Sequence, residues 1–365
     1  MSQPRGPQGS DQPKPLSDLA FYLAVKHQEE QQSIAARVAA GLSLLWPLLQ
    51  FDKLDETTPG WLHATTLQVE KSFRESEEAA FRFVQGSKWA VEPFSKPLKQ
   101  VETVFPVKDV QLAMRATGPA SIKKATKAAF SDPESDSGRL LSVSEGDVPP
   151  KGIEELADRL MAWGKLNSTG AGVKHTLNGG RGEVQQLVVA DSVERIKNRE
   201  TIGWARFTED SKTGPCYFCA VLASKGAVYL SDGSFDQSNR MIREVNKWRK
   251  ERRAFLGDGL AKVHDHCKCS LRPVYRKQDS MDSRAKYFER QWKQMFRDAP
   301  WLGSLEGSED LKEFRRVYKR PPPYSDRPVV NLAAVRRNRE LVAQELGASS
   351  PHARWWDRQV KALSS

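Results

Sequence analysis

The chain has 365 residues, of which 39% are hydrophobic and 28% are charged, and its formal net charge is +11. A chain of this length can bury a substantial core and typically forms two or three domains. It contains no run of about 18 apolar residues, so we predict no membrane span. The excess of Lys and Arg favours polyanionic partners such as nucleic acid, although basic residues also coat helices without any specific role.

The N-terminal residues 1–15 are polar and rich in Pro and Gln. They lack the apolar segment of a secretory signal, and they show no apolar periodicity. We therefore expect a disordered N-terminus and a protein that is made and kept in a cytoplasm, where thiols stay reduced.

Residues 16–130 are predicted to form a helical domain. Ser17 is expected to cap the first helix, and Thr58 the second, with Pro59 at the first helical position. Each helix carries an apolar stripe, so the two should pack as an antiparallel pair. His27 and His63 fall in these helices, where a histidine ordinarily has a structural or surface position.

Residues 131–152 are rich in Ser, Asp, Gly and Pro, and we predict a linker there, which is the main domain boundary. A helix should follow from Ile153, and then a loop over 167–182. The NGGRG segment of this loop could cradle a phosphate, but the start of a helix over 183–198 is the simpler interpretation.

The pattern changes from about Ile202, where IGWARFTED reads as a strand, and CSLRPVY reads as a second short strand. Ser283 is expected to cap a further helix. A break over 319–328 precedes a last predicted helix, 329–346, and a tail. The predicted fold is therefore mainly α with a small β element: a helical N-terminal domain, a linker, a compact α+β Cys/His core over 153–275 and a helical, basic C-terminal region over 276–365.

All four cysteines and two of the six histidines gather in two short motifs, C-x-x-C and H-x-H-C-x-C. Zinc is the leading candidate for a shared ligand, because Zn²⁺ prefers four N or S ligands in a tetrahedron. Six side chains could supply those four ligands: Cys216, Cys219, His264, His266, Cys267 and Cys269.

The spacing leaves several alternatives open. If 264–269 is extended, side chains alternate between two faces, which leads to either a Cys₄ or a Cys₂His₂ site. A turn could instead combine His266 with Cys269. The same residues could also form disulfides outside a cell, remain unrelated buried thiols, or belong to a catalytic metal or thiol site, which would require a nearby base.

The stretches GWARFTED, GPCYFCAVLASKGAVY and HDHCKCSLRPVY together resemble the core of MuF-like minor head proteins of tailed bacteriophages, in the form common among phages of actinobacteria. The matching positions are Gly203–Arg206, Cys216–Cys219, Gly226–Tyr229 and His264–Cys269. The helical segments upstream also resemble the N-terminal part of such proteins.

This resemblance implies a phage minor capsid protein that acts in head morphogenesis. Its expected partners are the phage portal protein, the major capsid or scaffold protein, and packaged DNA. It implies synthesis in the host cytoplasm and a final location in the virion, in the capsid interior or at the portal vertex. Capsid maturation protease is a related role in the same group, and so is an alternative here.

A protease needs a nucleophile beside a base, and the sequence has no G-x-S-x-G motif. Outside the Cys/His motifs, His175 in the predicted loop is the best candidate for a catalytic base. We therefore predict a structural protein rather than an enzyme.

The clearest basic stretch lies within 240–253 and is predicted to be helical. It makes a third interpretation possible, namely a zinc-stapled DNA-binding protein or nuclease. The candidate nucleic-acid contacts are Arg240, Arg243, Lys247, Arg249, Lys250, Arg252 and Arg253.

Overall fold

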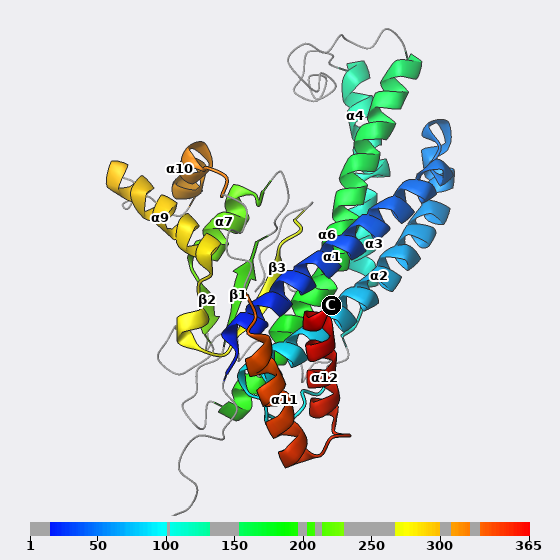
Figure 1. The fold of residues 1–365 in the computed structure, drawn as a ribbon. Coiled ribbons are helices and arrows are strands. Elements are labelled where there is room, and N and C mark those ends of the chain that lie inside the picture. Colours follow the sequence, from blue (N-terminus) through cyan, green and yellow to red (C-terminus); the bar gives the residue numbers. More distant parts are fainter. Residues whose placement is uncertain are drawn as a thin grey trace, which may run out of the picture.

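The fold is mainly helical with one small antiparallel sheet, which confirms the predicted fold class (Figure 1). The computed structural model describes residues 15–100, 103–131, 153–195, 203–208, 214–229, 267–299, 308–321 and 329–365. The predicted linker, apart from its first residue, and the basic stretch 240–253 lie outside these ranges, as does nearly all of the predicted disordered N-terminus.

Long helices that pack side by side make up the largest part of the molecule (Figure 1). Contacts such as Arg82 with Glu30 and Arg37 with Glu75 show that the first two helices are antiparallel, as predicted. Buried side chains from all five helices form one continuous core. The helices are α1 (Ser17–Leu45), α2 (Leu54–Val91), α3 (Val107–Thr117), α4 (Pro119–Ser131) and α6 (Ile153–Arg195), with the 3₁₀ turns η1 (Trp46–Leu48) and η2 (Phe51–Lys53) between α1 and α2.

Helix α6 runs unbroken through the segment 167–182, so the loop predicted there is wrong. Its glycines do not mark a turn, because they allow close approach to neighbouring helices. A Cβ atom at Gly179 would lie 2.7 Å from the Phe73 carbonyl oxygen, and one at Gly180 would lie 2.6 Å from Ser76 Oγ. Between residues 171 and 189 only Lys174 and Asn178 are even partly exposed, so the helix is buried on all sides.

The sheet packs against the lower part of these helices. Strand β1 (Gly203–Phe207) lies in the middle and pairs antiparallel with β2 (Ala227–Tyr229) and β3 (Ser270–Val274). Trp204, Phe207 and Leu271 join the core with residues of α1, α2 and α6. The strands predicted in IGWARFTED and CSLRPVY are therefore confirmed, and both contact the long helices directly.

Three helices form a second, smaller core beside the sheet, away from the long helices (Figure 1). Its centre is made by Ala220, Phe288 and Phe314, which are fully buried. The helices are α7 (Tyr217–Ser224), α9 (Ser283–Asp298) and α10 (Ser308–Val317).

The C-terminal residues form a helical hairpin instead of the expected tail. Helix α11 (Leu332–Leu346) confirms the predicted last helix, but α12 (Pro351–Ser364) follows it. Trp356 of α12 packs with Leu19 and Trp89, near the start of α1 and the end of α2. The signal for α12 was present in the sequence, since Ser350 caps the helix and Pro351 occupies its first position.

Three predicted helix starts are displaced. Ser17 and Ser283 are the first helical residues rather than caps, and the cap of α9 is Asp282, whose carboxylate accepts from the Ala285 amide. Helix α2 starts at Leu54, so that Pro59 lies inside it. This proline is tolerated because it lies near the exposed helix start, where water can satisfy the carbonyl that loses its intrahelical donor.

No single helix in the described ranges is long and apolar enough to span a membrane. The segments Ser17–Leu48 and Phe51–Val91 would pass on length and composition only as a bent pair.

Helix α6 offers a direct test of close packing. Gly179→Ala should destabilise the protein by about 1–3 kcal/mol, because the new methyl group meets the backbone of α2. Gly60→Ala is the matched control, since nothing lies within 4 Å of its Cβ position in helix α2, and it should stabilise by about 1 kcal/mol. Urea unfolding measures both, and equal stabilisation by the two variants would contradict this packing.

Candidate metal centre

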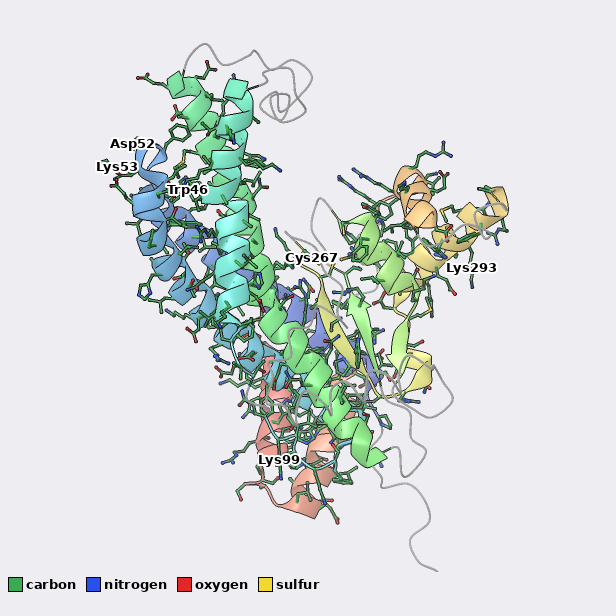
Figure 2. The ribbon with its side chains drawn as sticks, turned by 180° about the vertical axis from the view of Figure 1, so that it is seen from behind. Trp46, Asp52, Lys53, Lys99, Cys267 and Lys293 are labelled. Carbon is green, nitrogen blue, oxygen red and sulfur yellow. The ribbon has the colours of Figure 1, made fainter. Side chains whose placement is uncertain are left out.

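Three buried cysteines meet beside the sheet, between the long helices and the α7–α9–α10 unit (Figure 2). The sulfur atoms of Cys219, Cys267 and Cys269 all lie within 4.8 Å of one another, and those of Cys219 and Cys267 are 3.3 Å apart. Cys216 packs against this group and is partly exposed, and no disulfide joins any of the four. The structure thus brings both cysteine motifs together.

The C-x-x-C motif forms the N-terminus of helix α7. Cys216 is its N-cap, and its sulfur accepts a hydrogen bond from the Cys219 amide at 3.3 Å. Gly214, just before the motif, has a positive φ of 68°, a conformation that glycine adopts readily. The two sulfurs of this motif therefore lie at the N-terminal end of α7.

The C-x-C motif approaches as extended chain just before β3. Cys267 and Cys269 are 3% and 2% exposed, whereas Lys268 between them faces solvent. This alternation agrees with the expectation for an extended segment. Among the described residues, Cys219, Cys267 and Cys269 form the group that could hold a metal ion, and Cys216 packs against them. His264 and His266 lie outside the described ranges.

Two helix side chains hold the C-x-C backbone in place. Arg181 of α6 donates from Nη2 to the Cys267 carbonyl oxygen at 2.7 Å and from Nε to the Cys269 carbonyl oxygen at 3.0 Å. Gln28 of α1 donates to the Lys268 carbonyl oxygen at 2.6 Å. Three successive carbonyl groups are therefore bound by the long helices, so the cluster has a fixed position against them.

The same glutamine reaches the start of β3. Its Oε1 accepts from the Ser270 amide at 3.0 Å and from the Ser270 hydroxyl at 2.5 Å. A second set of hydrogen bonds lies nearby. Ser76 Oγ donates to Gln31 Oε1 and accepts from the Gly180 amide. Helices α1, α2 and α6 and strand β3 thus share one hydrogen-bonded layer beside the cysteines.

Positive charge surrounds the sulfurs. Arg181 and Arg206 are 2% and 6% exposed, and the charges of both lower the pKa of Cys267. Hydrogen bonds from Cys219 and Cys269 lower this pKa further and are the larger causes. By contrast, the pKa of Cys219 is raised, first by its hydrogen bond with Cys216.

The donor set fits a thiophilic metal ion. Sulfur ligands in this number and spacing suit ions that prefer thiolate, and a fully thiolate site would carry negative charge. Two buried guanidinium groups would offset that charge, which is otherwise costly to bury. The geometry can therefore hold a metal ion, with Cys219, Cys267 and Cys269 as its core ligands and Cys216 adjacent.

Other predicted site residues have different surroundings. His175 lies inside helix α6 and is 9% exposed, so it does not belong to a loop. His27 is buried and stacks on Phe83 with ring centroids 4.4 Å apart. Burial, assisted by the nearby Arg82 charge, lowers the pKa of His27 to about 3, so it is a neutral core residue. The seven basic candidates within 240–253 lie outside the described ranges.

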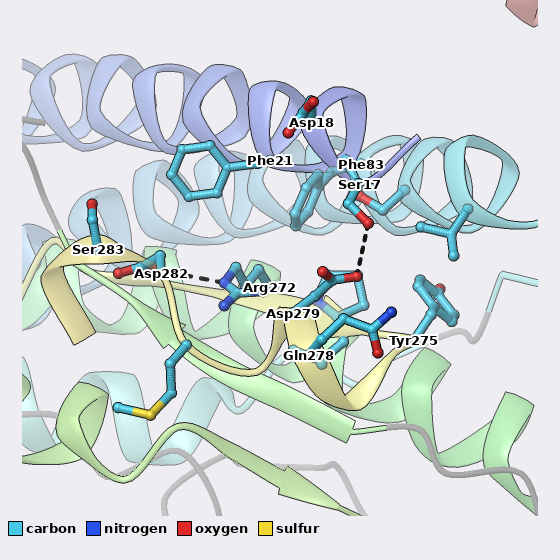
Figure 3. A pocket seen from close by; sticks show the side chains of 16 residues that line it. Ser17, Asp18, Phe21, Phe83, Arg272, Tyr275, Gln278, Asp279, Asp282 and Ser283 are labelled. Atoms are coloured by element: carbon cyan, nitrogen blue, oxygen red, sulfur yellow. Dashed lines mark hydrogen bonds and ion pairs between the residues drawn. The ribbon is translucent and has the colours of Figure 1, made fainter. Parts of the chain in front are cut away.

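A cavity of about 290 Å³ lies between the start of α1 and the segment joining β3 to α9 (Figure 3). Ser17 donates to Asp279 at 2.9 Å, and Arg272 lies 3.9 Å from Asp282. No Cys or His occurs among the described residues that line it. The first pair joins the start of α1 to the segment before α9, and the second joins β3 to the N-cap of α9.

The sequence did not indicate Arg181 or Gln28. Arg181 belongs to NGGRG, which looked like a loop, and Gln28 lies in a polar run of α1 without any motif. A signal for Arg181 was its position between the glycines of NGGRG, once this segment is recognised as helical.

Loss of the Arg181 hydrogen bonds to the Cys267 and Cys269 carbonyl groups should destabilise the protein. Arg181→Leu should lower the free energy of unfolding by about 2–5 kcal/mol, because two buried carbonyl groups lose charged donors. Arg159→Leu in the same helix is the control and should change it by less than about 1 kcal/mol, since Arg159 makes an i,i+4 ion pair with Glu155 near the surface. If urea unfolding showed equal losses of unfolding free energy for the two variants, a stabilising role of the Arg181 hydrogen bonds would be contradicted.

Of the comparisons with known proteins, one finds a match, and it covers one segment of the chain. No curated protein matches the chain, and no solved structure matches it. The segment 153–299 contains α6, the sheet, the four cysteines and α9. It is this segment, residues 153–299, that matches the family model described as VG15 protein.

Proposed function

We propose that this chain is a minor capsid protein of a tailed bacteriophage, a portal-associated structural component of the procapsid and virion, with a structural zinc ion at its cysteine cluster. The observation that carries the proposal is the cluster itself, inside the segment whose motifs resemble MuF-like minor head proteins. The VG15 family match covers the same segment.

The surroundings of the cluster favour a structural metal over a catalytic one. Structural zinc sites are closed by four protein ligands, whereas catalytic sites keep one position open for water or substrate. Four cysteines lie together here, three of them almost fully buried, and the metal-ligand group among the described residues contains no carboxylate. Such a site would fix the C-x-x-C motif at the start of α7 to the segment that precedes β3.

The second interpretation, a capsid maturation protease, requires a base and a nucleophile that substrate can reach. Its candidate base, His175, is mostly buried within a helix surrounded by other helices. This position favours the structural role. A zinc-stapled DNA-binding protein or nuclease is the remaining alternative.

Zinc should be present in stoichiometric amount. The protein purified under reducing conditions should contain one zinc ion per chain by elemental analysis, and Cys219→Ser should lose it. Because structural zinc contributes on the order of 10 kcal/mol to folding, this variant should become sensitive to proteolysis after residue 203 while α1 and α2 remain protected. His63→Ala, at an exposed histidine, is the control.

Two outcomes would contradict the zinc staple. One is the absence of metal from the reduced parent protein. The other is a Cys219→Ser variant with the circular dichroism and proteolysis pattern of the parent.

The capsid role can be tested by co-expression with the portal, scaffold and major capsid proteins of the same phage. We expect it to copurify with procapsids that contain portal and to be absent from shells assembled without portal. Equal incorporation into both kinds of shell would refute portal association. Capsid protein cleavage that depends on this chain and disappears in His175→Ala would establish the protease instead.

A further inference from the structure

Helix α9 presents a straight row of cations to solvent. Lys286, Arg290, Lys293 and Arg297 are all exposed, and their spacing of four, three and four residues places them on one helical face. The opposite face is buried, with Phe288 at 0% and Met295 at 3% exposure. Lys293 points away from the body of the molecule (Figure 2).

A second segment adds two cations beside this row. After α10 the chain runs along α9, because Gln291 Nε2 donates to the Lys319 carbonyl at 2.9 Å and the Lys319 amide donates to Gln291 Oε1 at 2.8 Å. Tyr287 OH also donates to the Arg320 carbonyl at 3.3 Å. Lys319 and Arg320 are both exposed. We call the six cations the α9 ridge: Lys286, Arg290, Lys293, Arg297, Lys319 and Arg320.

The ridge is hardly neutralised within the chain. In the described ranges, a carboxylate lies within ion-pair distance of only one of its six cations, Lys293, which is 2.7 Å from Glu289. Such an exposed i,i+4 pair contributes at most about 1 kcal/mol, so an external anion can replace it at little cost. The remaining charges are available to a partner.

The composition of the ridge indicates what kind of anion fits. A helix that inserts into a membrane surface needs a free apolar face, but the apolar face of α9 is buried under α7 and α10. A protein interface needs exposed aromatic or aliphatic anchors, and no described residue of α9 is a large exposed hydrophobic. A purely ionic row instead suits a polymer with regularly repeated charge.

The dimensions agree with a nucleic-acid backbone. Arg297 follows Lys286 by eleven residue steps, which is roughly 16 Å of helix. Along the same length of its axis, one strand of duplex DNA carries about five phosphates. We propose that the α9 ridge binds the phosphate backbone of duplex DNA without sequence preference.

This inference rests on the proposed function, since a component of a DNA-filled virion can meet packaged DNA, and it assigns that contact to residues other than those of 240–253. Sequence-independent contact is what a component facing packaged DNA requires, since the phosphate backbone carries no base information.

The test neutralises the row in the full-length protein. The ridge variant carries K286Q, R290Q, K293Q and R297Q, and the control carries K53Q, K71Q, K99Q and K108Q, four exposed lysines elsewhere. Both lose the same net charge. Fluorescence anisotropy with a labelled DNA duplex measures affinity between roughly 50 and 200 mM salt.

For the ridge variant, we expect roughly a tenfold or greater loss of affinity and a salt dependence whose slope falls by about three to four, because each lost phosphate contact removes about one released counterion. The control should keep the parent slope. Circular dichroism should match for all three proteins.

Equal losses in both variants would overturn the proposal, since they would show an effect of net charge alone. Parent-like binding by the ridge variant would also overturn it, as would tighter ridge-dependent binding to vesicles of anionic phospholipid than to duplex DNA. Copurification of the ridge variant with portal-containing procapsids, measured in parallel, separates this proposal from the proposed function. Loss of DNA binding with normal copurification concerns the ridge alone, whereas loss of copurification with normal DNA binding concerns the capsid role alone.

Discussion

The structure depends on one buried guanidinium group, that of Arg181. It is 2% exposed, and burial lowers its pKa, while the charge of Cys267 opposes that shift. A cation in this position needs acceptors, and it finds them in two carbonyl groups of the C-x-C segment and in the Asn178 side chain. This contact joins the long helices to the cysteine cluster. Without it, the buried guanidinium group and the buried carbonyl groups would lose hydrogen-bond partners, which costs free energy.

The arginine reaches the cysteines because α6 lies so close to its neighbours. Gly179 and Gly180 precede it directly and allow the backbones of α2 and α6 to approach. Ser76 on α2 bonds the Gly180 amide, so the same close approach also satisfies a polar group. Helix packing and the geometry of the candidate metal site are consequently parts of one arrangement.

This arrangement separates two kinds of surface. The cluster faces inward, against α6 and α1, where its role is to fix the sheet and α7 in position. The α9–α10 unit packs on the other side of α7 and faces solvent with positive charge. A buried metal-binding cluster beside an exposed basic helix suits a structural protein that presents a positively charged surface to a large polyanion.

Much of the secondary structure could be predicted because its signals are local. The apolar stripes of α1 and α2, the alternation in β1 and β3, and the amphipathic pattern of α9 are properties of short segments. The failures have different causes. The glycines of α6 are loop signals by local rules, but close packing against α2 overrides those rules. The proline of α2 is a helix-start signal, but the helix begins earlier because its exposed first turns tolerate proline. Helix α12 was missed although its cap was readable.

For the candidate site, the two short motifs and their six candidate ligands could be read from the sequence, because thiol and imidazole chemistry requires Cys and His. That Cys219, Cys267 and Cys269 lie within 4.8 Å of one another, and that Arg181 and Gln28 hold the second motif, became visible only in the folded chain. Those two residues come from helices distant in sequence, and their role is set by where the helices pack. No local pattern records such a position, since it arises from the fit of side chains between elements.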